Sequence, residues 1–372
     1  MIHELDRVDY ERVRPLFQGL GFQPFCLAVL AGLHRGRVFV DDPDCPAAAF
    51  LSRDDPWCYL AGDPGREAFN RVLNTAIYAH DVVPGYLTNL FLTCDPGDWG
   101  GQLAAVLAPR APVTTSRRHY LADDAAAIPA PVLPDRFGLR MMDEALRADP
   151  RLDVPPEVIE NLDKWATLPG DRLHDLGFVA IDEAAVKIAS WATVDGIVDG
   201  VGDAGVFTQA EYRRRGLAGA VTAAALRHGL EQGMRAIHWT CTHQNAGSIR
   251  LAEKLGLVRQ ADYLLHFFAF EEAEHLATGA YYQVEEGSYA AATAALERAF
   301  ALRGAHPFYV YHDAARAWAG LGDHARAFGF LRQAVAEGWE DVNETRSSPE
   351  FIGYHGLPEW EALITAMRDP GL

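Results

Sequence analysis

Three consecutive arginines followed by a glycine are the most distinctive chemical feature of this 372-residue sequence. Residues 213–218 read RRRGLA and lie between a short apolar run and a long alanine-rich amphipathic stretch. A glycine at a strand-to-helix turn lets the backbone approach an anion, and the first unpaired N–H groups of the helix then bind that anion. Because the chain has a net charge of −18, three adjacent arginines indicate a local anion site. We therefore expect a phosphate group to bind at this turn.

The turn resembles the pyrophosphate-binding signature of the GNAT N-acetyltransferase superfamily. Arg213, Gly216 and Ala218 match its R-x-x-G-x-A pattern. A second motif of the same superfamily is similar to the following segment of this chain, in Asn245, Ser248, Leu251 and the Leu-Gly-Leu of residues 255–257. The two motifs together are more specific than either alone, because a lone R-x-x-G-x-A occurs by chance in many chains. The resemblance implies an N-acetyltransferase that uses acetyl-CoA as co-substrate.

In this family the pantetheine arm pairs with a strand, and helix N–H groups bind the pyrophosphate. A splay between that strand and the next admits the thioester, and a strand N–H polarises its carbonyl. The resemblance thus assigns CoA binding to Val206, Phe207, Thr208, Arg213, Arg214, Arg215, Gly216, Leu217, Ala218, Gly219, Asn245 and Ser248. Asn245 would contact the pantetheine and also cap a helix, because its side-chain amide has several bonding sites.

A general base is needed because an amine with a pKa near that of lysine is mostly protonated at pH 7. Asp203 precedes a predicted strand at residues 204–208, near where many family members place a carboxylate, and it is our first candidate. Asp195 and Asp199, in the predicted loop before this strand, are alternatives. Asp and Gly residues in 195–203 are also typical of turns. Two histidines are weaker candidates, His238 and His243.

The general acid is where the sequence departs from the family pattern. Many members carry a tyrosine seven residues after the motif asparagine, placed to protonate the CoA thiolate, and here that position is Ala252. Ser248 is nearby but is a poor acid, and Tyr263 belongs to the next predicted strand. A thiol pKa near about 8.5 makes thiolate expulsion comparatively easy, so no side-chain acid is required.

Composition excludes several classes of partner. The 51 acidic residues against 33 basic ones disfavour nucleic acid and fit a cationic or amine substrate. No apolar stretch reaches the roughly 18 residues of a membrane span, so no membrane partner is expected, and residues 22–33 are predicted to form a buried helix. Five cysteines without a C-x-x-C pair indicate neither a disulfide framework nor a metal site, and favour the cytoplasm.

Three prolines within residues 123–136 indicate a linker. We predict an N-terminal lobe at 1–128, a catalytic domain at 129–274 and a helical domain at 275–372. The first lobe resembles the degenerate half of two-lobed GNAT proteins related to zwittermicin-resistance acetyltransferases. The fold class is α/β, the α+β GNAT fold with a mixed central sheet. Helices are expected at 66–80 and 97–108, helical segments around 143–166, a helix from 217 with Gly233 as its stop, and a helix from the Asn245 cap to Leu255. Expected strands are 86–92, a strand end at 118–121, 137–142, 177–182, 186–194, 204–208 and 236–241.

The tail contains an internal repeat. Residues 287–299 recur at 322–334 with an offset of 35, close to the roughly 34-residue tetratricopeptide period. Residues 358–363 would form a capping helix. A tetratricopeptide-like tail could bind a peptide or a second copy, although a structural role is favoured. Our leading function is acetyl transfer to a small cationic molecule or antibiotic. The alternatives are a protein or peptide N-acetyltransferase recruited through the tail, and a non-catalytic acyl-CoA-binding module.

Overall fold

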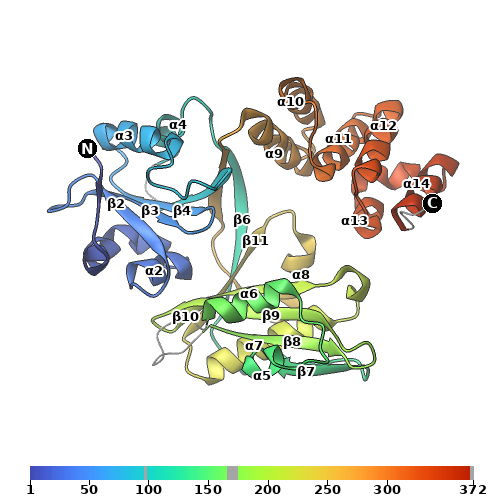
Figure 1. Cartoon of the computed structure of the whole chain (residues 1–372), viewed down its shortest axis with the longest axis horizontal. Helices are drawn as coiled ribbons and strands as arrows, with labels where there is room; N and C mark the ends of the chain where they lie inside the picture. The colour runs from blue at the N-terminus through green and yellow to red at the C-terminus, as the bar shows by residue number, and fades with distance from the viewer. Residues whose placement is uncertain (96–98, 166–174, 369–372) are drawn as a thin grey trace. The chain divides into compact units, whose positions relative to one another are not determined.

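The computed structural model describes residues 1–95, 99–165 and 175–368. These residues form two compact units, Met1–Phe267 and Phe268–Leu372. In the first unit, strands β6 Val113–Ala122 and β11 Ala236–Thr242 lie between two groups of strands and helices (Figure 1). The second unit is helical. In the described part of the chain, no helix combines the length and apolarity that crossing a membrane requires.

The first half of unit 1 is a small α/β lobe with its own core. Its strands are β1 His3–Glu4, β2 Gly36–Val40, β3 Ala48–Arg53, β4 Trp57–Gly62 and β5 Asn89–Cys94. Its α-helices are α1 Tyr10–Val13, α2 Pro24–Leu30, α3 Glu67–Tyr78 and α4 Gly100–Val106, and 3-10 turns cover Arg7–Asp9 and Arg14–Leu20. Apolar side chains of α1, α2 and β2–β4 pack into one cluster. This packing positions the loop between α2 and β2, which lines the cavity described below.

The second half of unit 1 contains the predicted catalytic elements. Its strands are β6 Val113–Ala122, β7 Phe137–Met141, β8 Leu176–Asp182, β9 Lys187–Val198, β10 Val201–Thr208, β11 Ala236–Thr242, β12 Val258–Arg259 and β13 Tyr263–Ala269. Its helices are α5 Glu144–Arg147, α6 Pro156–Trp165, α7 Leu217–Glu231 and α8 Ala246–Lys254, with a 3-10 turn at Ala210–Tyr212. Helices α7 and α8 cover one face of the sheet, while α5 and α6 cover β8 and β9 on the other.

The two halves share one mixed sheet because they exchange strands. Among the described residues the order is β1-β2-β3-β4-β5-β13-β6-β11-β10-β9-β8-β7, with β12 paired to β6. The late strand β13 lies between β5 and β6, and β6 continues the sheet by pairing antiparallel with β11. Pairs β4–β5 and β10–β11 are parallel. The exchange explains why residues on both sides of the predicted linker form one compact unit, and the boundary at residue 128 stays a prediction.

Most predicted elements are confirmed, with shifted ends. The fifth strand begins at Asn89 rather than at 86, because the chain turns over Pro84 and the Leu87 N–H bonds to its carbonyl at 3.1 Å. Helix α4 covers residues 100–106 of the predicted 97–108, whose residues 97 and 98 lie outside the described part. The predicted helical end at residue 166 also lies outside it.

The helices of unit 2 begin at equivalent places in the two sequence repeats. They are α9 Glu272–Glu285, α10 Tyr289–Leu302, α11 Phe308–Gly320, α12 His324–Ala336, α13 Val342–Ser347 and α14 Pro358–Arg368, with a 3-10 turn at Pro349–Tyr354. Helices α10 and α12 follow Gly287 and Gly322, whose φ angles are 74° and 79°. The repeated alanines and leucines, Ala292, Leu296, Ala299, Ala327, Leu331 and Ala334, are all buried.

Candidate functional site

The candidate site is built on the long hairpin of β9 and β10. Its turn contains only Asp199 and Gly200, which both have positive φ, 49° and 73°. Such two-residue turns match the twist of paired strands, and Asp-Gly is a preferred sequence for them. The prediction that residues 195–203 form a loop is therefore wrong. Asp195 lies within β9 and Asp203 within β10, where they are register partners on adjacent strands.

Asp203 lies at the point where the sheet opens. Its Oδ1 atom is buried and has no hydrogen-bond partner among the described residues. Burial raises its pKa to about 7, with a further rise from Asp195, while Arg117 and Arg53 oppose the change. A carboxyl group that titrates near neutrality is suited to accept a proton at pH 7. The side chain thus has the properties required of the first-choice base.

Two further carboxyl groups lie beside it. Trp165 donates its indole N–H to Oδ1 of Asp195 at 2.9 Å, and burial raises the pKa of Asp195. Asp175 accepts the backbone N–H of Ile197 at 3.0 Å, and burial together with Asp195 raises its pKa to about 7. Asp199, in contrast, is exposed in the hairpin turn and is paired with Arg14. Of the two alternative bases, only Asp195 adjoins Asp203.

Strands β10 and β11 separate immediately after Asp203. They pair in parallel through residues 201–203, whereas β10 continues to pair with β9 as far as Thr208. Val206, Phe207 and Thr208 thus have β9 on one side and, among the described residues, no ladder partner in β11 on the other. Strand edges of this kind can pair with an extended ligand. The splay expected from the resemblance is present at the expected strand.

The arginine turn joins the end of β10 to the N-terminus of α7. Arg213 donates its Nε–H to the Thr208 carbonyl at 3.4 Å, which links the turn to the strand. Arg214 has a φ of 63°, a strained conformation for a residue with a side chain. Gly216 has a φ of 84°, and a Cβ added there would meet no atom within 4 Å. All three arginines and Gly216 are exposed, while Ala218 and Gly219 are half-buried and Leu217 is buried. The exposed turn leads directly into the first N–H groups of α7, the usual place for an anion to bind.

The second motif forms a helix cap as predicted. Asn245 accepts the backbone N–H of Ser248 at 2.9 Å at the start of α8. The Ser248 hydroxyl accepts the indole N–H of Trp239 at 2.9 Å. Because Trp239 and His238 are consecutive in β11, their side chains lie on opposite faces of the sheet. Ser248 therefore lies on the face of Trp239, while Asp203 shares the face of His238.

Tyr263 is remote from Asp203. It begins β13 and is the register partner of Arg117 in β6, and its ring contacts Phe22 with centroids 4.8 Å apart. Strands β6 and β11 separate β13 from β10, so the backbones at Tyr263 and Asp203 are three strand spacings apart, roughly 14 Å. Ala252, at the position of the family tyrosine, is fully buried. The structure therefore does not bring Tyr263 and Asp203 together.

The histidines form a pair that the sequence did not indicate. Nε2 of His119 in β6 lies 2.9 Å from Nδ1 of His238 in β11, and burial lowers the pKa of both to about 4. At neutral pH both rings are neutral, so one donates and the other accepts. His243 lies with Nδ1 3.2 Å from the Ser116 carbonyl, at the end of the same strand pair. Among the described residues, neither of the two candidate histidines, His238 and His243, makes a hydrogen bond to Asp203.

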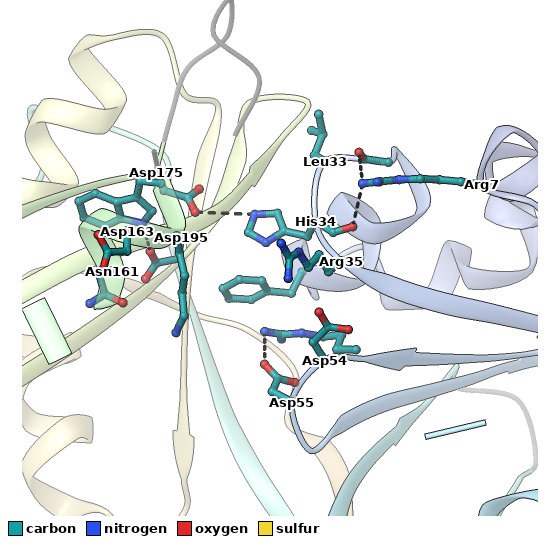
Figure 2. A pocket seen from close by; sticks show the side chains of 15 residues that line it. Arg7, Leu33, His34, Arg35, Asp54, Asp55, Asn161, Asp163, Asp175 and Asp195 are labelled. Carbon is teal, nitrogen blue, oxygen red and sulfur yellow. Dashed lines mark hydrogen bonds and ion pairs between the residues drawn. The ribbon is translucent and has the colours of Figure 1, made fainter. Parts of the chain in front are cut away.

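A cavity of about 730 Å³ opens next to Asp195. Figure 2 shows Asp163, Asp175 and Asp195 on one side of it, and Arg7, His34 and Arg35 on the other. Nε2 of His34 lies 3.7 Å from Oδ2 of Asp175 across the cavity. The described residues contain no group of three His, Cys, Asp or Glu side chains placed to hold a metal ion. This cavity is large enough for a small organic acceptor.

Comparison with known proteins identifies the family. Residues 14–266 match the GNAT acetyltransferase family. This chain belongs to that family. The uncharacterized N-acetyltransferase YdfB of Bacillus subtilis strain 168 is 22% identical over 268 residues, which are 72% of this chain and 98% of that protein. The expected enzyme class, a GNAT-type N-acetyltransferase, is confirmed.

Solved structures agree with the fold. A tandem GNAT protein from the clavulanic acid biosynthesis pathway has a TM-score of 0.51 at 15% identity, covering 73% of this chain and 98% of its own. A GCN5-related N-acetyltransferase-like protein from Streptococcus suis 89/1591 has a TM-score of 0.49 at 20% identity, covering 70% and 99%. The likeness to the clavulanic acid pathway protein, together with the mixed sheet of this structure, confirms the expected α/β fold.

Sequence reasoning missed the residues that line the cavity of this GNAT protein. His34, Arg35 and Arg53 come from the first lobe, which carries no chemical motif of its own. Asp175 and Trp165 flank residues 166–174, which lie outside the described part. One signal was available, because Asp199-Gly200 between apolar residues predicts a tight hairpin. That hairpin alone would have placed Asp195 opposite Ala204, and the register shift between Val201 and Asp203 is what places it opposite Asp203.

Proposed function

We propose that this protein transfers the acetyl group of acetyl-CoA to the amine of a small molecule bound in the cavity beside Asp195. The observation that carries the proposal is the opening between β10 and β11, which begins at a carboxyl group titrating near neutrality. Along the chain, the carboxyl group of Asp203 comes first, the unpaired strand edge at residues 206–208 second, and the N-terminus of α7 third. This order fits an extended thioester whose reactive end lies at Asp203.

The residues of the turn fit a pyrophosphate. The space around Gly216 and the exposed turn before α7 would admit the anion, and the arginines would add attraction. Val206, Phe207 and Thr208 would pair with the pantetheine arm, with Asn245 and Ser248 on its other side. When bound, acetyl-CoA supplies a thioester carbonyl that an amine can attack.

Asp203 would take the proton of the attacking amine. The amine nitrogen forms the new bond to the acetyl carbon, the carbon–sulfur bond breaks with its electron pair on sulfur, and the amine proton passes to the carboxylate. Ser248 already accepts a hydrogen bond from Trp239, and Tyr263 is distant. We therefore assign protonation of the thiolate to solvent, which its pKa of about 8.5 permits.

We also propose the organisation predicted from the sequence: an accessory lobe at 1–128 of the two-lobed type, a catalytic domain at 129–274 and a tetratricopeptide-like domain at 275–372. The equivalent burial of the repeated residues in α10 and α12 supports the last assignment. The tail would bind a peptide or a second copy if it binds a partner. A cytoplasmic location is supported by the five free cysteines.

The test is CoA binding by two glycine variants of one helix. Gly216 precedes α7 and Gly233 follows it, both have positive φ, and a Cβ at either would meet no atom within 4 Å. Backbone strain is thus matched, and only Gly216 adjoins the predicted pyrophosphate. We expect Gly216→Val to weaken CoA binding at least about tenfold, roughly 1.4 kcal/mol, and Gly233→Val to leave it unchanged. Equal CoA affinities of the two folded variants, measured by calorimetry, would contradict the assignment.

A further inference from the structure

The cavity has carboxyl groups on one wall and guanidinium groups on the other. One wall comes from α6, the start of β8 and β9, and contributes Asp163, Asp175 and Asp195 against one cation, Lys164. The other comes from residues 7–55 and contributes three arginines against two aspartates: Arg7, Arg35, Arg53, Asp54 and Asp55. Asp163 is paired with Arg147 at 2.5 Å, and burial raises the pKa of Asp175 and Asp195, so a ligand that crosses the cavity meets carboxyl groups at one end and guanidinium groups at the other.

The acidic wall is the one adjacent to Asp203. Asp195 is its register partner and is held in place by the indole N–H of Trp165. Asp175 is fixed by the backbone N–H of Ile197. A carboxyl pair on adjacent strands, with an aromatic ring beside it, fits a substrate ammonium group that must come close to Asp203. The amine end of the acceptor thus belongs at this wall.

On the opposite wall two of the three arginines are already engaged. Arg53 pairs with Asp55 at 2.5 Å, and its guanidinium lies 4.0 Å above the Phe25 ring. Arg7 donates to the carbonyls of Gly32 and His34, which holds the loop that carries Arg35. These contacts position the wall and leave little capacity for a ligand.

Arg35 differs from both. Its exposed side chain lines the cavity and makes no hydrogen bond or ion pair with any residue in the described ranges. A guanidinium presents a planar fork of donors that matches a carboxylate. Figure 2 shows Arg35 across from the Asp163, Asp175 and Asp195 side of the cavity. It is the group of this wall that can bind an anionic end of the acceptor.

We propose that the acceptor is a zwitterion, an amine that also carries a carboxylate, with its amine at Asp195, the register partner of Asp203, and its carboxylate on Arg35. The inference rests on the proposed acetyl transfer and deepens it by naming the substrate class. A zwitterionic acceptor replaces the purely cationic one expected from the acidic composition. The net charge describes the whole chain, whereas the acceptor meets the carboxyl groups and arginines that line this cavity.

The test compares matched ligands on the full-length protein with CoA present. Glycine, β-alanine, γ-aminobutyrate and ε-aminocaproate are each paired with the straight-chain amine of the same carbon count, and binding is measured by calorimetry alongside acetylation. We expect at least one amino acid to bind about tenfold or more tightly than its amine. Arg35→Gln should abolish that preference without changing amine affinity. Arg71→Gln removes an exposed positive charge on α3, outside the cavity lining, and should preserve the preference.

The outcomes separate this inference from the proposed function. Acetylation of plain amines as fast as amino acids, with Arg35→Gln indistinguishable from the parent, would overturn the zwitterion and leave acetyl transfer intact. Equal weakening of both ligand classes by Arg35→Gln would also overturn it, as would failure of every pair to bind. Loss of CoA binding in Gly233→Val as severe as in Gly216→Val would instead count against the proposed function.

Discussion

Replacing Asp203 with asparagine should lower activity and raise stability at alkaline pH. Asparagine keeps the shape of the side chain but cannot carry the charge that burial disfavours. The pKa of Asp203 is raised from 3.8 to about 7, which corresponds to a cost of about 4 kcal/mol for the ionised carboxylate in the folded protein. This carboxyl group therefore contributes stability that is fully present below the unfolded pKa and is lost as pH rises through about 7.

The magnitude can be tested between pH 5 and pH 8. Over this window the parent should lose about 2.5 kcal/mol more stability than Asp203→Asn, because the unfolded carboxyl is ionised throughout while the folded one ionises only near pH 7. For a unit of this size that difference corresponds to a melting temperature difference of roughly 5 °C. Asp199→Asn is the control, since Asp199 lies exposed in the hairpin turn and asparagine tolerates its positive φ.

The same variant should show the matching kinetic effect. The kcat/KM of the parent should rise with pH to a plateau with a midpoint near 7, and Asp203→Asn should lower the plateau by about a hundredfold, the scale of general-base catalysis. Parallel melting curves of parent and Asp203→Asn across this pH range would refute the reasoning, because they would show that the carboxyl is not held neutral by burial. Unchanged kcat/KM would move the role of base to Asp195 or to water.

Two further predictions concern the helical unit. Arg316 is buried and bonds to Glu285 at 2.6 Å and to Glu350 at 3.1 Å, so Glu350→Gln should cost about 3 kcal/mol and lower the melting temperature of this unit by roughly 10 °C. Glu297→Gln removes the exposed ion pair with Arg326 and should lower the free energy of unfolding by less than about 1 kcal/mol. Equal losses of unfolding free energy in the Glu350→Gln and Glu297→Gln variants would show that the buried ion pairs of Arg316 are not a source of stability. Deleting residues 275–372 should lower solubility or melting temperature and preserve CoA affinity by calorimetry, and a stable remainder that no longer binds CoA would contradict this.

Local sequence patterns determined the elements whose partners lie nearby in the chain. Asn245 caps α8 because its acceptor reaches an N–H three residues later, and Gly216 starts α7 because it adopts a positive φ without a Cβ clash. The offset of 35 placed α10 and α12 correctly for the same reason, since helix starts depend on residues within one turn. The CoA-binding residues themselves stay a prediction that rests on the resemblance.

Strand lengths and faces could not be derived in this way. The polar residues of 195–203 favour turns locally, yet pairing of β10 with both β9 and β11 holds Asp195 and Asp203 in extended strands. Strand pairing depends on hydrogen bonds to distant segments, which composition does not encode. The exchange of β6 and β13 between the two halves has the same origin, because either strand could have paired within its own half.

The sequence by itself determined the family and the helix caps, and it supplied the predicted anion turn and the candidate carboxylates. Only the tertiary structure decided that Asp203 stands beside Asp195 at the opening of the sheet, and that Arg35 faces Asp195 across a cavity. The physical reason is that charge and burial act through space. The pKa of a carboxyl group rises to about 7, and a guanidinium comes to face carboxyl groups across a cavity, only when segments more than a hundred residues apart in the chain come together.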